Sequence, residues 1–280
     1  MFYFDNIGGK KILKSSLLSE FEPDFKHLFT TKESFIKTKE PNLINTANSN
    51  LEMVLGNIGA AEENFYRIKQ THGTNIVINP KTTDIIEDTD GIILSNPNTA
   101  TVLHFADCTP VLLYDPKNRV AAGLHAGWRG TAGGISRKGV RILKEKFGSK
   151  PKDIIAAIGP CIGQEDFETG MEVYEALNST LTNSQNTLKS AQNTKENRIS
   201  GFFKFKETPK SELTEGIPRK LEGAKVFPDL AKINAAQLLD EGVETIDICH
   251  FKTYKNNDIL FSYRRENKTT NRISMVFKIG

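Results

Sequence analysis

Short apolar runs alternate along the chain with segments of helical apolar period, and this alternation predicts an α/β architecture. The short runs are rich in Ile, Val and Leu, which favours strands. Strands are predicted at 76–78, 85–86, 91–94, 101–105, 111–114, 120–124 and 154–158, and helices at 135–147 and 230–241.

Two local signals sharpen this prediction. Gly148 follows the segment 135–147, which carries Lys144 and Lys146 in its last turn, as expected at the end of a helix. The turn-forming sequence Asp-Pro-Lys-Asn at 115–118 separates the apolar runs 111–114 and 120–124, which predicts a β-hairpin. Such a hairpin would bring together the residues that flank its two strands.

The chain is predicted to form a single domain over residues 1–280, with one polar excursion. Residues 178–222 are rich in Ser, Thr, Asn and Lys and contain few apolar residues apart from Phe202, Phe203 and Phe205. Because sequence motifs with candidate chemistry lie on both sides of this segment, we interpret it as a polar helix end and a surface excursion rather than a second domain.

Two of these motifs flank the predicted hairpin. ADCTP at 106–110 places Cys108 before its first strand, and GLHAGWRG at 123–130 places His125 at the end of its second strand. A third motif, QTHG at 70–73, adds His72. One thiolate and two imidazoles make a three-ligand zinc site that leaves one tetrahedral position open, as catalytic zinc requires. The chain has no CxxC or HxxxH pair, so a buried thiol beside hydrogen-bonded histidines is the alternative.

Together these motifs resemble those of the YfiH family, the laccase-domain proteins. The resemblance runs from about residue 50 to the C-terminus and rests on QTHG at 70–73, ADCTPVLL at 106–113, HAGWRG at 125–130, IGPCIG at 158–163 and FSYRR at 261–265. It implies a single layered α/β domain of mixed β-sheets flanked by helices. It also implies that His72, Cys108 and His125 are the metal ligands.

The resemblance further implies an activity. It points to a zinc-dependent purine nucleoside phosphorylase acting on adenosine, inosine and S-methyl-5'-thioadenosine, with an accompanying adenosine deaminase activity. Purine nucleosides and phosphate are then the expected partners. Family members are also described as polyphenol oxidases and as peptidoglycan editing factors, and a purely non-catalytic editing role would tolerate the loss of Cys108.

Three positions depart from the family pattern. Lys32 stands where the family usually has an arginine, in a segment that lacks the usual pair of glycines. Lys252 stands in place of a cysteine before Thr253, and Asp166 in place of another cysteine. The resemblance therefore implies an intact metal site within a changed surrounding surface.

Deamination at such a site needs a carboxylate that moves protons beside the metal without binding it. Asp107 is the main candidate because it precedes a ligand, and Asp90 and Glu168 lie in motif-rich segments. The alternative for Asp107 is that it caps local backbone, as aspartate before a turn often does.

Phosphorolysis needs a group that holds phosphate, and the planar guanidinium of arginine suits this task. Arg129 and Arg264 are the candidates. If 264–265 lies in a strand, Arg264 and Arg265 point to opposite faces, so only one of them faces the site. Exposed ion pairs are the alternative for each arginine.

Two other enzyme classes would use parts of the same motifs. A metal-free cysteine hydrolase would use Cys108 as its nucleophile and His125 as its base. A multicopper oxidase needs many histidines, commonly as His-x-His, whereas this chain has 5 histidines and no such pair, so zinc is expected rather than copper.

The composition narrows the remaining possibilities. The chain has 280 residues, of which 38% are hydrophobic and 25% charged. Its net charge is only +3 and its basic residues are dispersed, which does not indicate nucleic-acid binding. It has no apolar run of membrane-helix length and no signal-peptide pattern, so a cytoplasmic location without membrane contact is expected. Its 3 scattered cysteines do not indicate a disulfide framework. The oligomeric state is left open.

Overall fold

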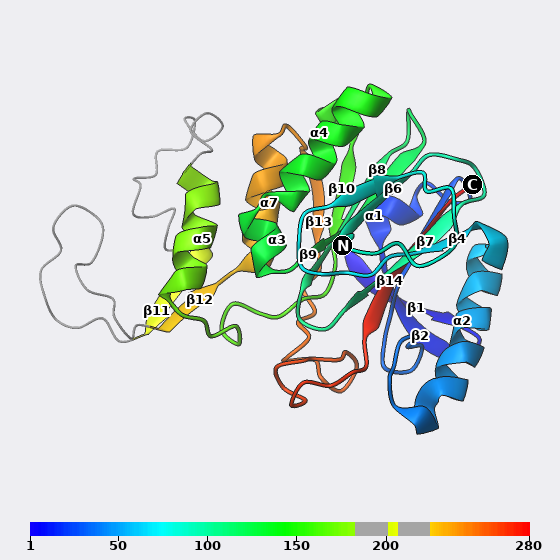
Figure 1. The fold of residues 1–280 in the computed structure, drawn as a ribbon, viewed down its shortest axis with the longest axis horizontal. Helices are drawn as coiled ribbons and strands as arrows, with labels where there is room; N and C mark the ends of the chain where they lie inside the picture. The colour runs from blue at the N-terminus through cyan, green and yellow to red at the C-terminus, as the bar shows by residue number, and fades with distance from the viewer. Residues whose placement is uncertain (183–200, 207–224) are drawn as a thin grey trace, which may run out of the picture.

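The computed structural model describes residues 1–182, 201–206 and 225–280. Two six-stranded β-sheets lie face to face, and helices cover the outer face of each (Figure 1). This layered arrangement of mixed sheets flanked by helices is the fold class predicted from the sequence.

The first sheet joins strands that are far apart in the sequence. All its neighbouring strands pair antiparallel except β4 and β7, which are parallel. The C-terminal strand β14 lies between β3 and β7, in the interior of the sheet. In spatial order the strands are β1 (Phe2–Ile7), β2 (Lys10–Ser15), β3 (Phe25–Thr30), β14 (Ile273–Ile279), β7 (Ala100–Phe105) and β4 (Phe65–Arg67).

The second sheet carries the predicted hairpin at its centre. Its strands β8 and β9 pair antiparallel, with Pro110 opposite His125. The outer pairs β10 with β13 and β5 with β6 are parallel. In spatial order the strands are β13 (Thr245–Ile248), β10 (Ile155–Ile158), β8 (Thr109–Asp115), β9 (Val120–Ala126), β6 (Gly91–Leu94) and β5 (Ile76–Ile78).

The longer helices cover the sheets. α2 (Ile44–Ile58) packs on the first sheet, and α4 (Ile135–Phe147) with α7 (Leu230–Asp240) packs on the second. None of the helices in the described ranges is long and apolar enough to cross a membrane. The remaining elements are α1 (Ser16–Ser19), α3 (Trp128–Ala132), α5 (Met171–Thr182), the strand pair β11 (Phe203–Lys206) and β12 (Lys225–Pro228), and 3-10 turns at Pro41–Leu43, Glu62–Asn64 and Pro151–Asp153.

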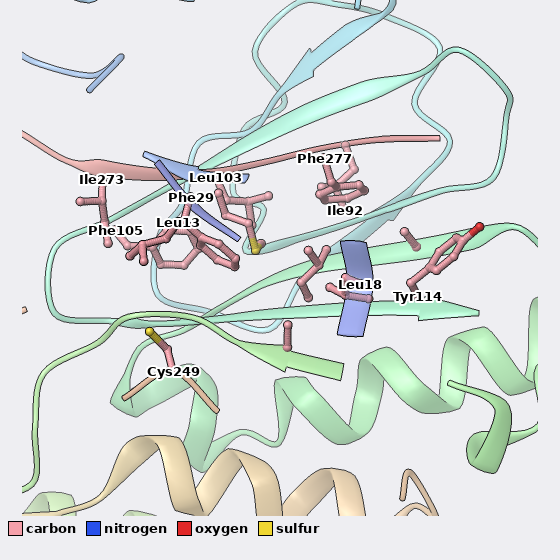
Figure 2. Close-up of a cluster of buried hydrophobic side chains, with 14 of the residues drawn as sticks. Leu13, Leu18, Phe29, Ile92, Leu103, Phe105, Tyr114, Cys249, Ile273 and Phe277 are labelled. Carbon is pink, nitrogen blue, oxygen red and sulfur yellow. The ribbon is translucent and has the colours of Figure 1, made fainter. Parts of the chain in front are cut away.

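The largest apolar cluster lies between the two sheets (Figure 2). Leu13, Phe29 and Leu103 of the first sheet share this cluster with Ile92 and Tyr114 of the second, and all are buried. Burying a side chain of this size contributes about 1.5–3 kcal/mol. The cluster therefore fixes how the two sheets pack on each other. This packing in turn positions the loops at the ends of the sheets.

Most of the predicted elements are confirmed. The apolar runs 111–114 and 120–124 form the hairpin β8–β9, and α4 ends at Gly148, whose φ of 70° lies in the left-handed region. The run 85–86 is not a strand, because Ile86 forms only an isolated bridge to Ile68 and Ile85 is 57% exposed. Two apolar residues between acidic neighbours are too few to cover a sheet edge.

Part of the predicted polar excursion at 178–222 lies in a helix and a strand. Residues 178–182 belong to α5, and Phe203 is buried in β11, where it packs against Tyr174. Residues 183–200 and 207–222 of the excursion lie outside the described residues. Phe203 is thus part of the packed apolar cluster around α5.

His27 on β3 is a buried histidine that makes stability depend on pH. It is 1% exposed, its Nε2 accepts a hydrogen bond from the Ser15 N–H (2.9 Å), and its Nδ1 has no hydrogen-bond partner among the described residues. Burial, with a smaller contribution from Lys14, lowers its pKa from 6.5 to about 3. The unfolded chain therefore binds the proton first, and stability is lost as the pH falls from 6.5 toward 3.

When the pH is lowered from 7 to 5, we expect the neutral buried His27 to reduce the unfolding free energy of the metal-free protein by about 2 kcal/mol. Urea unfolding at the two pH values measures this cost when wild type is compared with His27→Gln. The variant should lose about 2 kcal/mol less than the wild type over this range. An equal loss in both proteins would contradict a neutral buried imidazole.

Candidate metal centre

Three segments bring ligand atoms together at the ends of the two sheets. β7 of the first sheet ends at Phe105 and β8 of the second begins at Thr109, so Cys108 lies where the chain crosses between the sheets. His125 lies near the end of β9, and His72 lies in the loop before β5. One ligand atom from each of these three side chains lies within 4.8 Å of the other two.

The triad fits a zinc ion. Zn–N bonds of about 2.0–2.1 Å and a Zn–S bond of about 2.3 Å in a tetrahedron would place the three atoms about 3.5 Å apart, so small side-chain shifts close the triad on an ion. Thiolate and imidazole are donors that zinc favours. His125 is buried, Cys108 is partly buried and His72 is exposed, so the open side of the site lies toward His72 and solvent.

Asp90, at the start of β6, organises two of the three ligands. Its Oδ1 accepts hydrogen bonds from Nδ1 of His125 (2.7 Å) and from the N–H of His72 (2.9 Å). Its Oδ2 accepts from the N–H groups of Thr71 (3.1 Å) and Gly73 (2.7 Å). The bond at Nδ1 leaves Nε2 of His125 for the metal and fixes the ring orientation.

The same carboxylate stabilises an unusual backbone at His72. The φ of His72 is 66°, in the left-handed region that non-glycine residues seldom adopt, and three consecutive N–H groups bound to Asp90 hold the loop there. Burial raises the pKa of Asp90, but the hydrogen bonds from His125, Gly73 and Thr71 outweigh it and lower the pKa to about 2. Asp90 is therefore an anion behind the ligands at neutral pH.

Cys108 and His125 form a charged pair in the metal-free site. Burial raises the pKa of the Cys108 thiol, but the positive His125 and hydrogen bonds from both histidines outweigh it and lower the pKa to about 6. Burial lowers the pKa of His125, but Cys108 and Asp90 raise it to about 9. The thiolate is the form that binds metals, so Cys108 is ready for an ion at neutral pH.

Gly127 leaves the ligands their space. A Cβ at this position would lie 3.1 Å from Cδ2 of His72 and 3.2 Å from Sγ of Cys108. Its φ of −64° is ordinary, so the restriction comes from space and not from backbone strain. A methyl group here would push two ligands outward.

Gly127→Ala is therefore expected to weaken zinc binding by at least about tenfold, because metal sites tolerate only about 0.2 Å of error in ligand distance. Competition with a chromophoric chelator measures the affinity. Gly56→Ala is the matched control, since a Cβ on this residue of α2 meets nothing within 4 Å. Wild-type affinity in Gly127→Ala would show that the ligands accommodate the added methyl group.

A family model described as multi-copper polyphenol oxidoreductase laccase matches residues 41–279 of the chain. The chain belongs to this laccase-domain family, the YfiH family. A purine nucleoside phosphorylase of Bacteroides thetaiotaomicron is 31% identical over 207 residues, which are 70% of this chain and 66%, just under two thirds, of that relative. A purine nucleoside phosphorylase of Clostridium acetobutylicum is 28% identical over 267 residues, covering 94% of this chain and 96% of that relative.

Two solved structures share the YfiH fold. The Bacillus licheniformis protein YfiH superimposes with a TM-score of 0.75 at 22% identity and covers 96% of each chain. YlmD from Geobacillus stearothermophilus gives a TM-score of 0.75 at 23% identity and covers 99% of this chain and 98% of its own. At these identities the likeness concerns the fold.

The laccase-like domain implies metal binding, and the His-Cys-His triad is a group that can provide it. Within the described ranges it is the one cluster of three or more His, Cys, Asp or Glu side chains with ligand spacing. The copper cluster in the family description would need more histidines than this YfiH-family chain has.

Asp107 ties the Cys108 segment to the FSYRR motif of the YfiH family. Its Oδ1 accepts a hydrogen bond from the Thr253 hydroxyl (2.5 Å), and its Oδ2 accepts from the N–H of Arg264 (2.7 Å). Its φ of 82° is again left-handed. Both carboxylate oxygens thus bind residues that lie far away in the sequence, and one of these bonds is to a backbone N–H.

Arg129 and Arg264 are both exposed, in segments next to the metal centre. The guanidinium of Arg129 lies 4.2 Å from the ring centroid of Trp128, at the start of α3. Both terminal nitrogens of Arg264 donate to the backbone oxygen of Glu168 (3.1 Å each). Trp128 itself is partly buried and packs in the cluster around α5.

The FSYRR motif is a turn, not a strand, because the backbone N–H of Glu266 bonds to the oxygen of Ser262. Arg265 still diverges from Arg264, since it donates to the backbone oxygen of Tyr254 (2.6 Å). Lys32, at the position of the usual YfiH-family arginine, forms an ion pair with Glu266 (2.8 Å). The changed N-terminal loop therefore contacts this turn.

Two further polar residues, the candidate Glu168 and His104 on β7, have partners away from the triad. Glu168 is exposed and pairs with Lys225 (3.1 Å). Nδ1 of His104 lies 2.9 Å from the Ser274 hydroxyl.

Three features of the site were not predicted from the sequence: the organising role of Asp90, the space required at Gly127, and the position of Arg272. Arg272 lies beside the site because β14 pairs with β7. Of these features, only the space at Gly127 had a sequence signal, because Gly127 follows the ligand His125 by two residues.

Proposed function

We propose that this chain is a zinc-dependent purine nucleoside phosphorylase that acts on adenosine, inosine and S-methyl-5'-thioadenosine in the cytoplasm and also deaminates adenosine. The observation that carries the proposal is the triad of His72, Cys108 and His125, which is open on one side and fixed by Asp90 behind it. The names of its relatives, purine nucleoside phosphorylase, support the reaction class.

The described residues divide the work at the metal centre. His72, Cys108 and Nε2 of His125 would hold zinc, which when bound acts as a Lewis acid and activates water at neutral pH. Asp90 keeps the His125 ring and the His72 loop in place. Gly127 keeps the space beside the ligands free of side-chain atoms.

The arginines serve the phosphate. Arg129 and Arg264 are exposed next to the metal centre and form no ion pair with a carboxylate of the described residues, so both can attract an anion. For Asp107 we propose a positioning role, because it holds the backbone N–H of Arg264 beside the Cys108 segment.

The test is an assay of adenosine with the zinc-loaded protein, analysed by liquid chromatography. Adenine should form only when phosphate is present, and inosine should form without it. A chelator should abolish both products, and added zinc should restore them. Equal adenine formation with and without phosphate would contradict phosphorolysis. Absence of inosine would contradict the deaminase activity.

A second candidate function rests on the charged pair. The Cys108 thiolate, the protonated His125 and Asp90 behind it correspond to the activated nucleophile, the group that has taken its proton and the orienting group of a cysteine hydrolase. His72 has no role in such a triad, and for this reason we favour the metal site.

Iodoacetamide separates the two candidates. In the zinc enzyme, bound zinc should protect Cys108 from alkylation, and chelation should expose it while abolishing activity. In a cysteine hydrolase, the metal-free protein would be the active form. Amide or ester hydrolysis that increases on chelation would favour the hydrolase.

A further inference from the structure

Arg272 lies beside the metal centre although the sequence places it far from all three ligands. It directly precedes β14, whose first residue Ile273 pairs with Phe105, the last residue of β7. From Phe105 the chain continues to Cys108, and the Phe105 ring centroid lies 5.4 Å from that of His125. The backbone of Arg272 therefore lies at the end of the sheet that is next to the metal ligands.

The arginines of the described residues fall into two groups. One group pairs with carboxylates: Arg67 with Glu62, Arg119 with Asp24, Arg137 with Asp240 and Arg141 with Glu241. The other group forms no ion pair with a described carboxylate, and each member lies over an aromatic ring instead: Arg129 over Trp128, Arg264 over Phe167, Arg265 over Tyr254 and Arg272 over Tyr263. The second group lies in α3, in the FSYRR turn and directly before β14.

Arg272 differs from the rest of this group because it is partly buried, whereas Arg129, Arg264 and Arg265 are exposed. Burial lowers its pKa, against the opposing influence of Cys108, Tyr263 and Asp107. An arginine does not give up its proton in a protein, so it keeps its charge in a partly desolvated place. Such a cation without a carboxylate partner favours an anionic ligand.

The guanidinium is held in a way that leaves one edge available. Nη1 donates to the backbone oxygens of Thr269 and Asn271 (2.5 and 2.8 Å), which fixes the plane of the group. Nε and Nη2 donate to no described residue. Two parallel N–H groups on one edge are the geometry that binds two oxygens of a phosphate.

We propose that Arg272 binds the phosphate co-substrate through its Nε–Nη2 edge, beside the metal centre. The inference rests on the proposed phosphorylase function and adds to it a partly buried residue that holds the phosphate. Arg129 and Arg264, which are exposed, attract phosphate from solvent, and Arg272 is the group that orients it.

The experiment uses the zinc-loaded full chain and inorganic phosphate as the probe. Phosphate binding is measured by calorimetric titration, and phosphorolysis of adenosine by initial rates at varied phosphate and varied adenosine. The variants are Arg272→Met, Arg272→Lys, which keeps the charge without the planar edge, and Arg141→Met, which removes an exposed arginine on α4. Zinc content and circular dichroism check that each variant is folded and loaded.

Arg272→Met should weaken phosphate binding and raise the KM for phosphate by at least about tenfold, the loss expected for a charge-assisted hydrogen bond, while the KM for adenosine stays near the wild-type value. Arg272→Lys should lie between Met and wild type, and Arg141→Met should match wild type. If Arg272→Met does not fold, the comparison of Arg272→Lys with wild type decides.

Wild-type phosphate affinity in both Arg272 variants would overturn the assignment even if phosphorolysis is observed. No phosphate binding by the wild-type protein would also overturn it. Phosphate binding that depends on Arg272 in a protein without phosphorolysis would support the anion site and would count against the proposed function alone.

Discussion

Cys108→Ala is expected to abolish stoichiometric zinc binding and, with it, both phosphorolysis and deamination. The substitution removes the single thiolate of the triad and leaves two imidazoles, of which that of His72 is exposed. Loss of a ligand should exceed the about 10–100-fold loss of metal affinity that follows loss of an outer hydrogen-bond partner. Elemental analysis of the purified protein and the adenosine assay measure the two effects.

Cys249→Ala is the matched control for this substitution. Cys249 is a buried thiol whose pKa burial raises to about 12, so it remains protonated at neutral pH, and thiols bind metal as thiolates. This variant should keep its zinc and its activity. An active, zinc-free Cys108→Ala protein would contradict the account of the site.

Asp90→Asn is expected to lower zinc affinity by about 10–100-fold and the unfolding free energy by about 3 kcal/mol. Both carboxylate oxygens accept from N–H groups, Oδ1 from His72 and His125 and Oδ2 from Thr71 and Gly73. An asparagine must direct its NH₂ group at one of these sets of donors. Chelator competition and urea unfolding measure the two losses.

Asp88→Asn is the control in the same loop. Asp88 is exposed and accepts from side chains, namely the Thr71 hydroxyl (2.7 Å) and the Asn75 amide (2.9 Å), and it does not contact a ligand. This variant should bind zinc nearly as tightly as the wild type. Equal losses in the Asp88 and Asp90 variants would mean that loop order, and not the buried carboxylate, determines affinity.

The sequence predicts the parts of the site that depend on local pattern. The hairpin follows from two apolar runs around a turn, and it places Cys108 just before the strand that pairs with the strand of His125. The residue types then predict a metal site. These inferences needed only short-range periodicity and the chemistry of the side chains.

The parts that depend on long-range pairing could not be predicted. Asp90 was considered as a proton carrier, but its role depends on the packing of the loop at His72 against β6 and β9. The position of Arg272 depends on insertion of the last strand between β3 and β7. The strand conformation considered for 264–265 is not present, because a hydrogen bond between Glu266 and Ser262 folds this segment into a turn.

The most direct test of the central claim is the quantity of ribose 1-phosphate formed from adenosine and phosphate by the zinc-loaded protein, relative to the free purine bases. For the wild type, we predict ribose 1-phosphate equal to the sum of adenine and the hypoxanthine that follows deamination, and for Cys108→Ala we predict none of these products. Adenine accompanied by free ribose, without ribose 1-phosphate, would contradict phosphorolysis at this metal centre.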